Sequence, residues 1–247
     1  MNILEGKVMG VIGGMGPLAT NVFYDMVIEK TEAERDQDHI NMIILSHATM
    51  PDRTAAIKEG KTDEIFEKLL KDARFLEESG ACCIAVPCNT SHYVLGWVQE
   101  NVNIPIINMI DEAVLMVKEA AGSGIGKDGE KVKIGVMATD GTIEMGLYQK
   151  ALKAQGLEPV VPSSENQKKV MKIIYEGVKK GHPVNPEDFK AVADEFKEKG
   201  CAKALMACTE LSVYKIKEGL DDYYMDAMEA LAKKAIEICG KKLMKGI

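Results

Sequence analysis

Two cysteines followed by small hydrogen-bonding residues are the side chains of this sequence best suited to chemistry. Cys88 ends an apolar run and precedes Asn-Thr-Ser-His, and Cys208 ends a second apolar run and precedes Thr-Glu. The motif Glu78-Ser79-Gly80 lies upstream of the first cysteine at the same offset as Glu198-Lys199-Gly200 lies upstream of the second. A helix that begins just after a strand-end cysteine stabilises its thiolate. The repeat therefore predicts an enzyme with two facing acid/base groups.

A metal site is the main alternative for these cysteines, because Cys88 and His92 are four residues apart. The spacing lacks a Cys-x-x-Cys pair, and the other three histidines do not cluster along the chain. We expect no metal. The remaining cysteines lack the strand-end context, and we expect them to pack as small apolar side chains: Cys82, Cys83, Cys201 and Cys239.

Strand-like and helix-like segments alternate along the whole chain. The apolar run Val8–Gly13 leads into a glycine loop and a helical stretch from Leu18 to about Glu34, which is the opening of a βαβ unit. The pattern restarts at 133–138, where Gly135 matches Gly10 at an offset of 125. Further strands are expected at 42–46, 82–87, 104–108, 159–161 and 202–207. Further helices are expected at 63–78, 91–101, 112–121, 165–180, 186–200 and 221–242, and one more ends at 155. Asn185 and Pro186 are the expected N-cap and first-turn proline of the helix 186–200.

This alternation predicts an α/β protein with parallel sheets flanked by helices. We expect two pseudo-symmetric domains: residues 1–112 with about 220–247, and residues 113–219. The polar, glycine-rich stretch 122–129 is the expected crossing between them. Ligands of open parallel sheets bind at the carboxyl ends of the strands. Both glycine loops and both cysteines lie at such ends, so we expect the active site in a cleft between the domains.

The composition excludes several classes of protein. A net charge of −7 argues against a nucleic-acid partner, and no apolar run approaches the roughly 18 residues of a membrane helix. Six cysteines in 247 residues are too few for a disulfide scaffold, and the first residues resemble no signal peptide. We therefore expect a cytoplasmic protein with reduced thiols and no membrane partner.

Three groups are candidates for holding an anionic ligand. The loop Gly13–Pro17 lacks the order of a dinucleotide or Walker motif, and its free N–H groups better suit a carboxylate. Arg53 follows Pro-Asp in a loop after an expected strand, where its guanidinium could pair with a carboxylate. Lys179 is a second candidate cation, with Lys180 as the alternative.

Four separated motifs resemble the aspartate/glutamate racemase family, and within it the aspartate racemase branch. They span the chain from about residue 8 to 240: Gly13-Gly14-Met15-Gly16-Pro17-Leu18-Ala19-Thr20, Pro51-Asp52-Arg53-Thr54, Pro87-Cys88-Asn89-Thr90-Ser91-His92 and Ala207-Cys208-Thr209-Glu210. Glu210 stands where the glutamate racemase branch has histidine. Ser91 and Ala207 replace an alanine and a glycine that are frequent in the family.

The resemblance implies a cofactor-independent racemase, often a homodimer, in which two cysteines flank the α-carbon of a small dicarboxylic amino acid. One thiolate removes the α-proton and the opposite thiol reprotonates the other face. By the same analogy, Arg53 and Lys179 would hold the side-chain carboxylate and Met15 would shape the pocket. The α-carboxylate and amine would be held by Asn89, Thr90, Ser91, Thr139 and Thr209, and Glu210 is also assigned to the substrate site.

Aspartate is the expected substrate, and glutamate or both remain open. A related isomerase, decarboxylase or hydantoin racemase reaction is the first alternative, although such enzymes often lack one of the cysteines. A non-catalytic protein that binds an acidic amino acid is the second. It would need the cleft but would give no reason for two matched thiols.

Overall fold

The computed structural model describes residues 4–122 and 129–244. The chain divides into two compact units. Unit 1 comprises residues 1–109 and 228–247, and unit 2 comprises residues 110–227. Each unit is an α/β structure built on a parallel sheet, so the expected fold class is confirmed.

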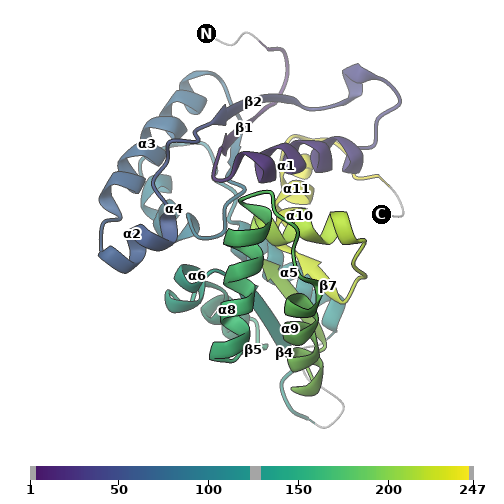
Figure 1. Ribbon diagram of the computed structural model, residues 1–247. Coiled ribbons are helices and arrows are strands. Elements are labelled where there is room, and N and C mark those ends of the chain that lie inside the picture. Colours follow the sequence, from purple (N-terminus) through teal and green to yellow (C-terminus); the bar gives the residue numbers. More distant parts are fainter. Residues whose placement is uncertain (1–3, 123–128, 245–247) are drawn as a thin grey trace. The chain divides into compact units, whose positions relative to one another are not determined.

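Unit 1 contains a three-stranded parallel sheet in the order β2-β1-β3. Its central strand β1 is buried at all six positions, as expected for a parallel strand covered on both faces. The strands are β1 (Val8–Gly13), β2 (Asn41–Ser46) and β3 (Cys83–Ala85). The helices are α1 (Pro17–Lys30), η1 (Asp36–Asp38), α2 (Arg53–Glu59), α3 (Asp63–Glu78), α4 (His92–Gln99) and nearly all of α11 (Ala227–Ile238). In Figure 1, α3 and α4 lie to one side of these strands and α1 and α11 to the other.

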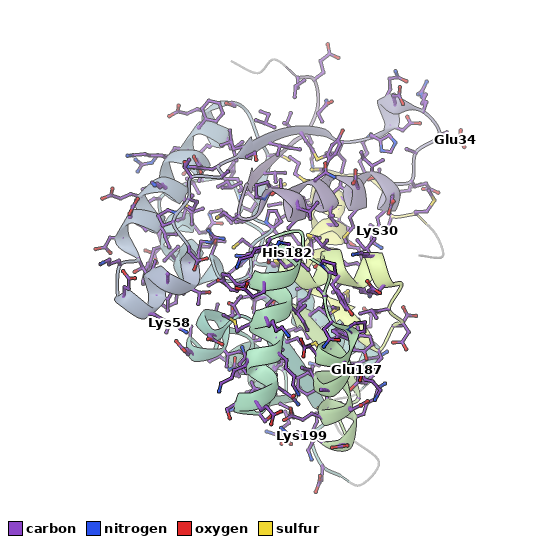
Figure 2. The ribbon with its side chains drawn as sticks, viewed as in Figure 1. Lys30, Glu34, Lys58, His182, Glu187 and Lys199 are labelled. Carbon is purple, nitrogen blue, oxygen red and sulfur yellow. The ribbon has the colours of Figure 1, made fainter. Side chains whose placement is uncertain are left out.

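Unit 2 contains a four-stranded parallel sheet in the order β5-β4-β6-β7. The strands are β4 (Lys133–Ala138), β5 (Glu158–Val160), β6 (Lys203–Ala207) and β7 (Tyr224–Asp226). The helices are α5 (Met109–Ala121), α6 (Asp140–Glu144), α7 (Leu147–Ala154), α8 (Ser164–Lys172), η2 (Ile173–Val178), α9 (Pro186–Glu198) and α10 (Thr209–Glu218). Charged side chains on the outer faces are exposed, among them Glu187 and Lys199 (Figure 2).

The matched glycines of the two units lie where a helix packs against the sheet. A Cβ added at Gly10 would lie 3.0 Å from Leu76 Cδ1 of α3, and one added at Gly135 would lie 2.5 Å from the Phe196 ring of α9. Leu76 and Phe196 are both fully buried. The absent side chain therefore lets each helix approach the sheet closely, and the repeat seen in the sequence is also a repeat of packing.

Two of the expected elements are interrupted. The helix expected to run to residue 155 is two helices, α6 and α7, because Gly146 lies between them with a φ of +66°. The helix expected at 165–180 begins as α8 and continues as η2, a stretch of π-helix. Asn185 caps α9 and Pro186 is its first residue, as expected.

The prediction of a strand at 104–108 is wrong, because this segment forms only an isolated β-bridge, between Ile106 and Ile84 of β3. Pro105 has no N–H to donate to a ladder. The Gln99 side chain also occupies backbone groups that a strand would use. It accepts a hydrogen bond from Ile106 N at 2.6 Å and donates one to Ile104 O at 3.2 Å.

The C-terminal end of the chain belongs to unit 1. The expected helix 221–242 is shorter, because its first residues form β7, and α11 follows. Lys30 of α1 pairs with Glu229 at 3.0 Å, and Glu32 N donates to Lys242 O at 2.9 Å (Figure 2 labels Lys30). Residues 123–128 of the expected crossing lie outside the described residues. Among the residues that are described, no helix combines the length and apolar character needed to span a membrane.

Candidate active site

Cys88 lies in the turn that connects β3 to α4. Its side chain is 5% exposed, and Ser91 Oγ donates a hydrogen bond to Cys88 Sγ at 3.0 Å. Ser91 immediately precedes α4, so the thiol lies beside the start of a helix, where the backbone dipoles favour a negative charge. Asn89 and Thr90 complete the same turn and are buried.

Met15 and Arg53 connect to this thiol through a continuous set of contacts in unit 1. Ser91 Oγ lies 3.4 Å from Met15 Sδ, and Arg53 Nη2 donates to Met15 O at 3.2 Å. Arg53 Nη1 donates to Pro51 O at 2.8 Å, so its guanidinium is held by two carbonyls. Asp52 caps α2 by accepting from Ala55 N, which fixes the helix whose first residue is Arg53. Unit 1 thus brings Met15, Arg53, Ser91 and Cys88 together.

The glycine loop is shaped by contacts within unit 1. Gly14 has a φ of +85°, and a Cβ there would lie 2.5 Å from His47 N. Gly14 N donates to Thr20 Oγ1 at 2.8 Å. The expectation that this loop offers free N–H groups to a carboxylate is therefore wrong for Gly14, because the Thr20 hydroxyl already occupies that donor.

His92 positions the Cys88 turn through its ring nitrogens. His92 Nδ1 lies 2.9 Å from Cys88 O, and Met109 N donates to His92 Nε2 at 3.0 Å. Because Nε2 accepts a hydrogen bond from the amide, it carries no proton. The ring proton is therefore on Nδ1, which donates to the carbonyl of Cys88. Burial lowers the pKa of His92, which favours this neutral ring. The imidazole contacts the backbone of Cys88 rather than its sulfur.

Cys208 is the residue immediately before α10 and is 6% exposed. Its thiol donates a hydrogen bond to Glu210 Oε2 at 2.9 Å, and Thr209 Oγ1 lies 3.5 Å from the same oxygen. Burial raises the pKa of Cys208 well above its usual value, and the negative charge of Glu210 raises it further. Cys208 is therefore a protonated thiol whose acceptor is a carboxylate. The two cysteines have different partners.

Lys179 rather than Lys180 lies beside Glu210. Lys179 Nζ is 3.7 Å from Glu210 Oε1 and 4.3 Å from the centre of the Tyr175 ring. Lys180 is paired with Glu176 and its side chain is 53% exposed. The backbone N–H of Lys179 donates a hydrogen bond to the carbonyl of Ile174, five residues earlier, so the wide π-helical turn of η2 extends to Lys179.

Thr139 occupies the neighbouring strand end in unit 2. Ala138 of β4 is paired with Ala207 of β6, and Thr139 and Cys208 are the residues that follow them. Thr139 Oγ1 accepts from Thr142 N and thereby caps α6. Unit 2 therefore places Thr139, Cys208, Thr209, Glu210 and Lys179 near the carboxyl ends of its strands.

The sequence interpretation missed a second buried carboxylate in unit 2. Asp226 ends β7 and is 2% exposed, and Ser212 Oγ donates to it at 2.7 Å. Burial raises the pKa of the Tyr148 phenol, and the negative charge of Asp226 adds to this effect. An acidic residue at the end of a short apolar strand was the available signal. The helical spacing of residues 221–242 predicts a helix there and obscures this short strand.

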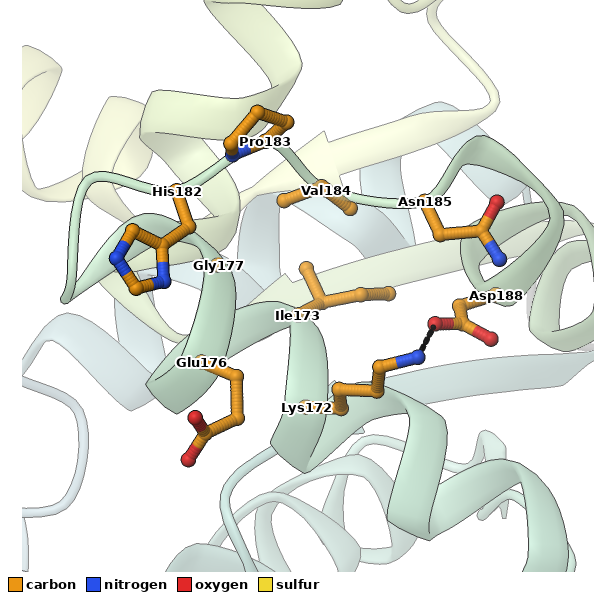
Figure 3. Close-up of a pocket in the computed structure, with 9 residues that line it drawn as sticks. All are labelled: Lys172, Ile173, Glu176, Gly177, His182, Pro183, Val184, Asn185 and Asp188. Atoms are coloured by element: carbon orange, nitrogen blue, oxygen red, sulfur yellow. Dashed lines mark hydrogen bonds and ion pairs between the residues drawn. The ribbon is translucent and has the colours of Figure 1, made fainter.

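One pocket of unit 2 lies apart from these residues. It has a volume of about 180 Å³ and is lined by nine residues of α8, η2, α9 and the connecting loop (Figure 3). Lys172 and Asp188 pair across it at 2.8 Å. None of its lining residues belongs to the predicted substrate site.

Comparison with known proteins gives a consistent result. Residues 12–235 match the family model described as Asp/Glu/Hydantoin racemase. The broad specificity amino-acid racemase RacX of Bacillus subtilis is 26% identical over 232 residues, which are 92% of this chain and 96% of RacX.

Several solved structures match nearly the whole chain. The aspartate racemase of Picrophilus torridus has a TM-score of 0.79 and 30% identity, with 97% of each chain covered. An aspartate racemase homologue from Pyrococcus horikoshii has a TM-score of 0.74 and 26% identity, and covers 95% of this chain and 99% of its own. The family match, which extends over most of the sequence, and these two structures establish that this chain belongs to the Asp/Glu/hydantoin racemase family.

Proposed function

We propose that this protein racemises an acidic amino acid, with aspartate as the preferred substrate, and that Cys88 and Cys208 are the two bases. The observation that carries the proposal is the matched placement of the two thiols. Each is buried in the segment that leads from the carboxyl end of a parallel strand into a helix, with a hydrogen-bonding side chain within 3.0 Å.

The different partners of the two thiols define the proposed resting state. Ser91 donates to the Cys88 sulfur, which stabilises a thiolate, whereas the Cys208 thiol donates to Glu210 and keeps its proton. The Cys88 thiolate takes the α-proton of one enantiomer and becomes a thiol. Cys208 delivers its own proton to the opposite face and becomes a thiolate. The reverse reaction begins from that second state, and exchange of protons with solvent restores the first.

The proposed reaction needs no cofactor if the chain itself stabilises the developing carbanion. An α-proton is weakly acidic, so donors aimed at the substrate carboxylate must carry much of the catalysis. Asn89 and Thr90 in unit 1 and Thr139 and Thr209 in unit 2 are the proposed donors. All four are buried at strand ends beside the two cysteines.

Two cations support an acidic substrate. Arg53 belongs to the group that contains Cys88, and Lys179 belongs to the group that contains Cys208. The two solved relatives are named for aspartate, which favours aspartate over glutamate. The name of RacX makes a broader range of amino acids the second candidate.

We also propose that the protein acts in the cytoplasm as a homodimer. All six cysteines are free thiols, which suits a reducing compartment. Among the described strands, β2 pairs with β1 alone, so its other edge offers unpaired backbone groups to a second copy.

Proton NMR in deuterated water tests the reaction. Purified protein is given L-aspartate, and in parallel L-glutamate and L-alanine, without added cofactor. We expect loss of the α-proton signal and appearance of D-aspartate at a higher rate than with the other two. In a two-base mechanism, early product carries deuterium while the remaining substrate does not.

Matched variants assign the bases. Cys88→Ser and Cys208→Ser should each lower kcat by at least about 100-fold, the lower range for general acid–base catalysis, while Cys201→Ser should leave it unchanged. No exchange with any of the three amino acids would refute the racemase proposal. Early deuterium in the recovered substrate, or full activity of either active-site variant, would refute the two-base mechanism.

A further inference from the structure

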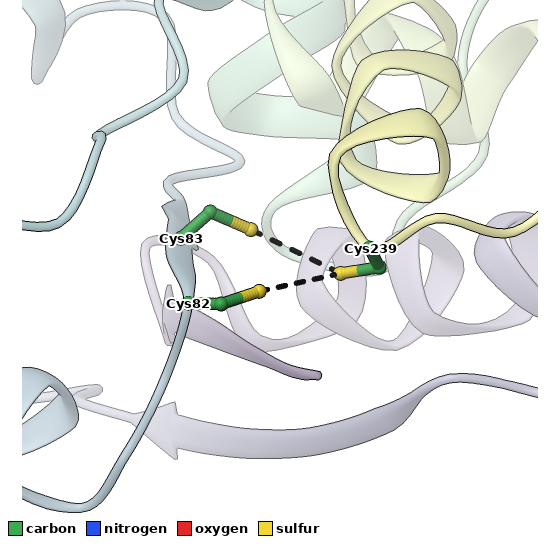
Figure 4. A group of neighbouring side chains, drawn as sticks. All are labelled: Cys82, Cys83 and Cys239. Atoms are coloured by element: carbon green, nitrogen blue, oxygen red, sulfur yellow. Dashed lines mark hydrogen bonds between the residues drawn. The ribbon is translucent and has the colours of Figure 1, made fainter. Parts of the chain in front are cut away.

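Three cysteines outside the racemase site lie together in unit 1. Cys82 precedes β3, Cys83 is its first residue, and Cys239 follows α11 (Figure 4). Cys239 Sγ lies 4.0 Å from Cys82 Sγ and 4.0 Å from Cys83 Sγ. All three sulfurs lie within 4.8 Å of one another. The sequence analysis predicts that these residues pack as apolar side chains, because they lack the strand-end context of Cys88 and Cys208.

The surroundings of the cluster are those of a partly shielded site. Cys83 is fully buried and Cys239 is 6% exposed, while Cys82 is half-buried and gives access to small solutes. Lys7 lies beside the cluster, since its Nζ donates to Ile238 O at 2.6 Å, one residue before Cys239. A nearby ammonium group offsets part of the negative charge that builds up when several thiols ionise together.

We propose that Cys82, Cys83 and Cys239 form a three-sulfur site for a thiophilic metal ion, with Cu⁺ preferred over Zn²⁺. Thiolates select soft ions such as Cu⁺ and zinc. Metal–sulfur bonds of about 2.3 Å in a flat three-coordinate arrangement place the sulfurs about 4.0 Å apart. The two distances from Cys239 match this value, and the distance between Cys82 Sγ and Cys83 Sγ is within 4.8 Å.

The number of ligands decides between the two ions. Within the described part of the chain, the cluster of possible metal ligands consists of these three cysteines, with no histidine or carboxylate to complete a tetrahedron. Structural zinc sites are almost always four-coordinate. Three thiolates alone suit Cu⁺, which accepts three sulfur ligands, whereas Zn²⁺ would have to recruit a water molecule through the Cys82 side.

The site lies at the opposite end of β3 from the racemase thiol. Cys83 and Cys88 are five residues apart, which corresponds to about 16 Å of extended chain. A bound ion would link the segment after α11 to the first residue of β3. It would therefore stabilise unit 1 without contacting the substrate, because an ion that binds only the folded state shifts the folding equilibrium.

The test uses the full chain carrying Cys88→Ser and Cys208→Ser, so that the racemase thiols cannot bind metal. Reduced protein is titrated anaerobically with Cu⁺ against a coloured Cu⁺ chelator, and separately with Zn²⁺ against a coloured zinc indicator. We expect one Cu⁺ per chain, three sulfur neighbours in the X-ray absorption spectrum, and a rise in the unfolding temperature.

Single substitutions in that background locate the site. Cys82→Ser is the main variant, because its half-buried position tolerates a small polar side chain, and we expect it to weaken Cu⁺ binding at least 100-fold. Cys201→Ser, which removes a buried cysteine elsewhere, should leave binding unchanged. Copper binding that Cys82→Ser does not affect, absence of binding in competition, or two sulfur neighbours in place of three would overturn the proposal. Tighter binding of Zn²⁺ than of Cu⁺ would overturn the assignment of the ion.

Discussion

At the scale of single residues, the two thiols are alike in position and unlike in environment. Cys88 receives a hydrogen bond from a neutral hydroxyl, and Cys208 gives one to a carboxylate. In the proposed mechanism the two bases hold one proton between them, and this difference in partners favours the state in which Cys208 carries it. Glu210 is therefore the side chain that holds the resting proton on Cys208.

This role of Glu210 predicts a change in pH dependence for Glu210→Gln. In the proposed mechanism the active enzyme holds one proton on the thiol pair, so kcat/KM should rise as the first proton of the pair is lost and fall as the second is lost. The negative charge of Glu210, after burial, raises the pKa of Cys208. Its removal lowers that pKa, so the alkaline fall of kcat/KM should move to lower pH.

The measurement is the pH profile of kcat/KM, taken in either direction. Glu176→Gln is the matched control, because it neutralises an exposed glutamate that pairs with Lys180. An alkaline limb that stays in place, or moves to higher pH, in Glu210→Gln would contradict the role given to this carboxylate.

The residues of the candidate site could be named from the sequence, but their contacts could not. Strand ends and helix starts are local features and indicated Cys88, while the family resemblance indicated Ser91 and Glu210. The choice of Lys179 over Lys180 depends on the π-helical turn, and the sequence carries no periodic signal for it. Asp226 was missed for a similar reason, since a three-residue strand leaves too short a pattern.

At the scale of elements, the two units repeat the same way of packing a helix on a strand. Gly10 faces Leu76 of α3 and Gly135 faces Phe196 of α9. The longer strands and helices were predictable because their apolar spacing extends over enough residues. The short or interrupted elements were not, since a single glycine at 146 or a glutamine side chain at 99 determines them.

This packing predicts unequal effects of two matched substitutions. The new methyl group of Gly135→Ala would lie 2.5 Å from a buried aromatic ring, while that of Gly10→Ala would lie no closer than 3.0 Å to Leu76 and 3.1 Å to Ala81. We expect Gly135→Ala to lower the free energy of unfolding by about 1–3 kcal/mol, as for other overpacked cores, and Gly10→Ala to lower it less.

Chemical denaturation followed by circular dichroism measures both variants. Hydrogen exchange read by mass spectrometry should place the loss of protection in β4 and α9 for Gly135→Ala. Equal stability of the two variants would contradict the packing argument.

At the scale of the whole molecule, the proposed dimer gives a direct expectation. Ile44 lies on the edge strand β2 and is 38% exposed. We expect light scattering to give twice the mass of one chain and Ile44→Lys to shift the mass towards that of a monomer. Ile216→Lys, at a 56% exposed position on α10, should leave the mass unchanged. A wild-type protein with the mass of one chain would refute the dimer.

The division of unit 1 into two chain segments also has a consequence for synthesis. Unit 2 is a single continuous stretch, whereas residues 228–247, which belong to unit 1, are translated after it. At about 5–20 residues per second, making the intervening stretch takes on the order of 6–24 s. During that time α1 has been translated but lacks its partner on α11, the Glu229 carboxylate that pairs with Lys30. On the ribosome, the later unit can therefore finish folding before the earlier one.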